Sequence, residues 1–163
     1  MTARWRATSR AELEQIGGWV HDAYFEWEDV GHDPSTGVVT VPFQQEPSSE
    51  EECGQPGARL VAHRPLGASV YKVPFVRCTA TLRHATACVV DGRHRDDPGM
   101  LDVIEAGASA SEIVFAPVTG PEIRAWVDAI DVEIEMTDEI VFYVRRVTGR
   151  LAATDSRWED PPA

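Results

Sequence analysis

Two His-Asp dipeptides near the start of the chain carry side chains whose types and spacing suggest ligand chemistry. His21-Asp22 and His32-Asp33 flank a stretch that predicts the first strand of a β-hairpin. Imidazole and carboxylate groups are the ligands that zinc, manganese and iron sites use. The pattern therefore makes His21, Asp22 and His32 candidate ligand-binding residues.

The expected hairpin geometry argues against a shared site. If the turn begins near Asp33, then His32 lies at its tip and His21 at its base, roughly 30 Å away along an extended strand. Neighbouring strand residues also point to opposite faces, so each dipeptide offers one ligand at most. In the simpler structural explanation, Asp22 bonds nearby backbone and Asp33 forms a turn. We predict no resident metal or cofactor.

The sequence lacks the common motifs of nucleophilic, nucleotide-binding and zinc-dependent enzymes. The chain contains no GxSxG, GxGxxG, GxxxxGK[ST] or HExxH motif. The acidic series that begins at Asp128 and Asp131 lacks the glycine of a calcium loop and is typical of the wet face of a strand. His84 is interpreted as a strand residue at a sheet surface. No catalytic residue is assigned.

Strands and one helix must position these side chains. Ser9 and Glu12 have capping-box spacing, which predicts a helix near residues 9–20. Turn chemistry at 33–37 connects a strand over 23–30 to a strand over 38–43, where Pro42 favours an edge or a strand end. Strand patterns also cover 59–64, 70–90 (one bent strand or two), 100–105, 112–118 and 140–147, with loops at 46–58 and 91–99. Residues 121–136 fit a bent strand, although 121–130 fit a helix equally well.

The fold class that follows is α+β and predominantly antiparallel β. We expect a sandwich or partly open barrel of about 7–8 strands with one short N-terminal helix. Residues 1–150 are expected to form a single domain, because 163 residues suit one domain and no boundary is visible. Residues 151–163 are expected to form a flexible C-terminal tail.

Four segments carry a resemblance. HDAYFEWEDVGHD, GVVTVPFQQE, VPFVRCTATLRHA and AWVDAIDVEIEMTDE resemble segments of an uncharacterised family of small bacterial β-rich proteins with an HDAYF-type N-terminal segment. The resemblance spans most of the chain between Trp19 and Glu139. It implies a mostly antiparallel β fold behind an N-terminal helix, and it favours strand over helix for 121–130. It implies no activity.

Charge and cysteine content exclude several functional classes. With 27 acidic and 15 basic residues, the formal charge of −12 argues against binding to nucleic acid or to an anionic membrane. Three cysteines, no CxxC pair and no secretory segment predict a cytoplasmic protein with free thiols. Cys78 and Cys88 are expected to be buried, and Cys53 to be reactive. The arginines that could form a local basic patch are expected instead to lie on solvated faces or to pair with carboxylates: Arg77, Arg83, Arg93, Arg95, Arg145, Arg146 and Arg150.

Three functional hypotheses follow. The first is a non-enzymatic binding or interaction domain that recognises a protein partner or forms a homodimer. Clustered aromatic residues and an edge strand over 38–43 favour it. The alternative is a small metal- or acid/base-dependent enzyme that uses His21, Asp22 and His32. A third option, an acidic protein that masks a basic partner, agrees with the charge.

Overall fold

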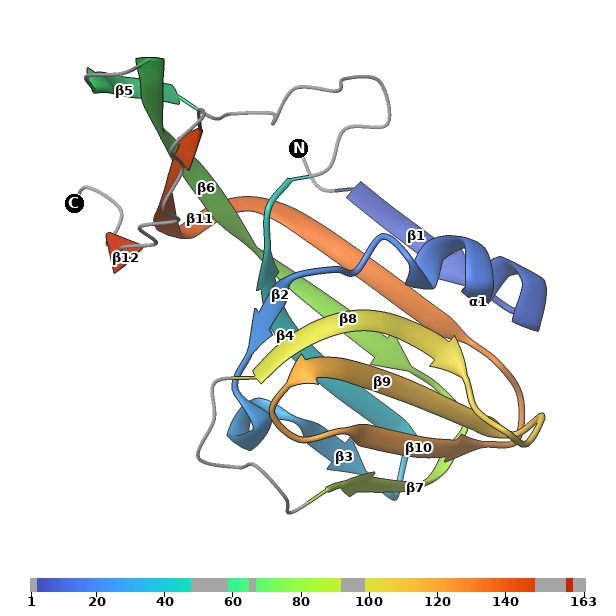
Figure 1. Ribbon diagram of the computed structural model, residues 1–163. Coiled ribbons are helices and arrows are strands. Elements are labelled where there is room, and N and C mark those ends of the chain that lie inside the picture. The colour runs from blue at the N-terminus through green and yellow to red at the C-terminus, as the bar shows by residue number, and fades with distance from the viewer. Residues whose placement is uncertain (1–2, 48–58, 65–66, 92–98, 149–157, 160–163) are drawn as a thin grey trace. The chain divides into compact units, whose positions relative to one another are not determined.

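The computed structural model describes residues 3–47, 59–64, 67–91, 99–148 and 158–159 (Figure 1). The chain divides into two compact units: residues 1–45 with 78–137, and residues 46–77 with 138–163. Its elements are β1 (Ala3–Ala7), α1 (Arg10–Gly17), β2 (Ala23–Phe25), the 3-10 turn η1 (Trp27–Asp29), β3 (Gly31–Asp33), β4 (Val38–Gln45), β5 (Arg59–Arg64), β6 (Ala68–Leu82), β7 (Ala85–Val90), β8 (Gly99–Ala106), β9 (Glu112–Thr119), β10 (Ile123–Val127), β11 (Val132–Thr148) and β12 (Trp158–Glu159).

The predicted fold class is confirmed, but the predicted number of strands is wrong. The described pairings are antiparallel and join 12 strands, compared with the 7–8 expected. In the first unit the order is β1-β11-β6-β4-β2-β8-β9-β10-β7, with β3 also on β4. The sheet is open, with β1 and β7 as its end strands. The count was too low because the short strands β1, β3 and β12 were not predicted, and because 70–90, expected as one bent strand or two, forms two.

The predicted helix forms and is shorter than expected. Ser9 is its N-cap, and the Ser9 hydroxyl accepts a hydrogen bond from the Glu12 N–H at 3.3 Å. The helix ends at Gly17, which lies against β8: a Cβ there would be 1.8 Å from the Ile104 carbonyl oxygen. Figure 1 shows α1 beside β1 and β8. Gly17 is thus required for close approach of helix and strand.

The first hairpin differs from the prediction. The strand expected over 23–30 ends at Phe25 and is followed by η1, after which β3 forms a separate short strand. β2 pairs with β4 at Tyr24↔Gln44, and β3 pairs with β4 from Gly31↔Thr40. Strand β4 lies inside the sheet, with β6 on its other side, so its assignment as an edge was wrong. Pro42 falls between these two paired stretches, so neither β2 nor β3 provides a register partner for it.

Two corners lie within the stretches over 70–90, expected as one bent strand or two, and over 121–136, expected as one bent strand. Residues 70–90 form β6 and β7, which do not neighbour each other in the sheet although only Arg83 and His84 connect them. His84 makes this corner in the left-handed region, at φ 62°. Residues 121–136 contain β10 and the start of β11, so strand rather than helix is confirmed there, with a turn at 128–131.

The core of the first unit combines α1 with the inward faces of its strands. Strand β4 alternates strictly, with Val39, Val41 and Phe43 buried. The largest fully buried side chains elsewhere in this unit are Leu13, Leu82, Leu101, Ile104, Ile113, Phe115 and Ile123. Burial of these side chains is the main stabilising term of the unit, since free energy follows the apolar area removed from water.

The second unit is built on the outer halves of β6 and β11, with β5 on β6 and β12 on β11. Phe75 stacks on Phe142 with ring centroids 5.0 Å apart. Arg77 donates to both carboxylate oxygens of Glu139 at 2.9 and 3.0 Å, which is the expected role for this arginine. Several predictions fall on residues that the structure does not describe: those for Cys53, Arg93, Arg95, Arg150, most of the loop at 46–58 and most of the loop at 91–99. Of the C-terminal tail expected to be flexible, only Trp158 and Glu159 are described, and they form β12.

Within the described ranges, no helix has the length and apolar character that a membrane span requires.

Candidate functional site

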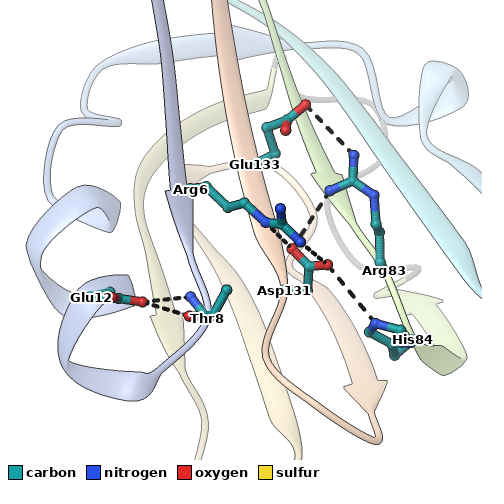
Figure 2. Close-up of polar contacts among 7 residues, drawn as sticks. All are labelled: Arg6, Thr8, Glu12, Arg83, His84, Asp131 and Glu133. Atoms are coloured by element: carbon teal, nitrogen blue, oxygen red, sulfur yellow. Dashed lines mark hydrogen bonds and ion pairs between the residues drawn. The ribbon is translucent and has the colours of Figure 1, made fainter.

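The centre of the candidate site is Asp131. Its carboxylate is buried by tertiary packing, which the local sequence does not predict. Its side chain is 8% exposed at the start of β11, where the alternating acids predicted a wet face. Arg6 on β1 donates from Nε to Oδ1 at 2.8 Å and from Nη2 to Oδ2 at 2.9 Å (Figure 2). This bidentate geometry is the strongest form of charge-assisted hydrogen bond between side chains.

The β6–β7 corner supplies two further groups, a guanidinium and an imidazole. Arg83 Nη1 lies 3.6 Å from Asp131 Oδ1, and Arg83 Nη2 lies 3.6 Å from Glu133 Oε1. His84 Nε2 lies 3.9 Å from Asp131 Oδ2 (Figure 2). Asp131 lies in the turn that precedes β11. Its side chain therefore connects this turn with β1 and with the β6–β7 corner.

Local contacts hold Arg6 in place. The chain leaves β1 through Thr8, whose N–H and hydroxyl donate to Glu12 Oε2 at 2.7 and 3.0 Å (Figure 2). These bonds lower the pKa of Glu12, the backbone bond from Thr8 being the largest cause. Glu12 thus fixes the junction of β1 and α1 two residues beyond Arg6.

The electrostatics of the cluster keep Asp131 ionised. Hydrogen bonds from Arg6 lower the pKa of Asp131 despite its burial, and the charges of Arg6, Arg83 and His84 act in the same direction. Arg83 Nη1 is buried and has no hydrogen-bond partner in the described structure, so its interaction with Asp131 is through charge alone. The arrangement is suited to holding strands together.

Four loops meet around this cluster, and we call their surface the loop end. It consists of residues 33–37, 83–84, 107–111 and 128–131. Four backbone hydrogen bonds of 2.8–2.9 Å connect these loops or the strands that leave them: Ala85 N–H to Gly37 O, Arg83 N–H to Asp131 O, Asp128 N–H to His84 O, and Val127 N–H to Ser111 O. Gly37 has φ +64°, and a Cβ there would lie 3.1 Å from Ala85 O. The loop end is therefore fixed by its backbone.

The outward side chains of the loop end are small or polar. Asp33 accepts from the Ser35 and Thr36 hydroxyls at 2.6 and 2.8 Å, and these bonds lower the pKa of Asp33 to about 2. The His84 side chain is 57% exposed. The other exposed positions are Pro34, Ala108, Ser109, Ala110, Ser111, Asp128 and Ala129. Such a surface offers many hydrogen-bonding groups and little apolar area.

The structure does not bring His21 and His32 together. Tyr24 pairs with Gln44 and His32 with Val39, so about 17 Å of β4 separates these two register positions. His21 lies three residues before Tyr24, exposed, with Nδ1 3.8 Å from Asp22 Oδ2. His32 Nε2 is buried without a hydrogen-bond partner among the described atoms. The geometry therefore joins His21 with Asp22 and leaves His32 at the other end of β4.

Sequence reasoning missed Asp131 and misplaced His84, which lies between strands and not in one. No local signal marks Asp131, because its main partner Arg6 is 125 residues away in the sequence. No group of three or more His, Cys, Asp or Glu side chains suited to a metal ion occurs in the part of the chain that the structure describes.

Comparison of the chain with known protein families, with curated proteins and with solved structures gives no match.

Proposed function

We propose that the protein is a non-enzymatic binding module and that the loop end is the surface it presents to a partner protein. The observation that carries this proposal is the set of four backbone hydrogen bonds that joins separate loops around the buried Asp131. A surface whose backbone is already ordered loses less conformational entropy on binding. Loops fixed on a rigid β framework are also the usual place for recognition residues.

The conformation of His84 supports this assignment. A left-handed conformation costs an L-residue on the order of 1 kcal/mol, and non-glycine residues in this region cluster at functional sites. Here the strained backbone at φ 62° lies at the corner, and the imidazole is mostly exposed. A ligand-facing role explains why histidine is present where glycine would be less strained.

Charge favours a partner with a basic surface. Arg6 and Arg83 interact with Asp131 and Glu133, so these four charges cancel. No ion pair of Asp33 or Asp128 is found within the described residues, so both leave the loop end with exposed negative charge. A protein of net charge −12 would attract a basic partner at long range and accelerate association.

Three alanine-to-arginine variants test the proposal. Ala110→Arg and Ala129→Arg place a long cationic side chain on exposed positions of the loop end. Ala3→Arg is the matched control. It makes the same change at Ala3, an exposed residue that begins β1 and lies four residues before Ala7, where the strand ends. Each purified full-length variant is immobilised and exposed to a lysate of the host cell, and retained proteins are quantified by mass spectrometry.

We expect at least one protein to be retained equally by the parent and by Ala3→Arg, and at least tenfold less by both loop-end variants. The same protein, purified, should bind the parent in solution with an affinity that falls as salt rises. Identical profiles for all four proteins would overturn the proposal. Sedimentation of each variant shows whether the partner is a second copy of the chain, since a dimer would then dissociate only in the loop-end variants.

A further inference from the structure

We draw no further inference here: the strongest candidate, the uncharged end strand β7 with Val89 52% exposed, is an apolar edge of the sheet, and nothing in the described residues shows what covers it.

Discussion

Arg6 and Asp131 form a bidentate ion pair between the first strand and the start of β11, 125 residues later. The carboxylate is buried, and the guanidinium reaches it from the exposed side of β1. Because Asp131 also lies beside Arg83 and His84, one side chain connects three segments of the first unit. The stability of the loop end therefore depends on this carboxylate.

Replacement of Asp131 by asparagine should destabilise the protein. Asn keeps the shape but removes the anion that Arg6 binds and leaves Arg83 with Glu133 alone, so we expect a loss on the order of 2 kcal/mol in the free energy of unfolding. The exposed Asp128 is the matched control, and Asp128→Asn should change stability by less than about 0.5 kcal/mol. Urea denaturation at pH 7 measures both. Equal losses in the two variants would show that the ion pairs around Asp131 contribute nothing specific.

The contribution of Asp131 to the free energy of unfolding should decrease at acid pH. Its folded pKa lies below the unfolded value of 3.8. The contribution is therefore fully present above pH 4 to 5 and is lost as the pH falls through the folded pKa. The difference in unfolding free energy between the parent and Asp131→Asn should shrink as the pH falls from 5 towards 3. A difference that grows on acidification would contradict this assignment.

Asp33 should titrate far below an ordinary aspartate. Hydrogen bonds from Ser35 and Thr36 hold its pKa at about 2. We expect carbon-detected NMR of the carboxyl group to give this value. In the double variant Ser35→Ala/Thr36→Val, the pKa should rise towards 3.8, because the hydroxyl donors that favour the charged form are gone. An unchanged pKa in the double variant would assign the shift to another cause.

Adjacent glycines should respond differently to alanine. Gly17→Ala would place a Cβ 1.8 Å from the Ile104 carbonyl oxygen, so the helix must move away from β8. We expect a loss of at least about 2 kcal/mol, as for overpacked cores. Gly18→Ala meets no atom within 4 Å and has φ −72°, so it should be neutral or slightly stabilising. Thermal unfolding of both variants checks this, and equal melting temperatures would exclude the close approach.

The two described cysteines should be poor nucleophiles in the folded protein. Burial raises the pKa of Cys78 to about 12 and also raises the pKa of Cys88. Because the thiolate is the reactive form, iodoacetamide at pH 8 should not modify Cys78 until the protein unfolds. Cys88, which is less buried, should react slowly. Peptide mass spectrometry after timed labelling gives each rate, and fast native labelling of Cys78 would refute its burial.

Local sequence patterns were sufficient to predict the helix and several strands. The alternation in Val38–Gln45, the β-branched run before Thr119 and the capping pair of Ser9 and Glu12 each depend on residues close in sequence. Their local geometry follows from the two-residue period of strands and from the unsatisfied N–H groups of a helix start. The class of the fold was therefore predictable, as was the free state of Cys78 and Cys88.

Other features required the whole chain. An acidic residue in an alternating pattern is predicted to be exposed to solvent. No residue close to Asp131 in the sequence indicates that Arg6 and Arg83 will neutralise its charge. The corners at His84 and at 128–131 are equally hidden, because the backbone bonds that hold them join loops far apart in sequence. The sequence by itself determined most of the longer strand segments and the overall negative charge. The tertiary structure decided which carboxylate is buried and which loops meet, since both depend on contacts that only long-range packing creates.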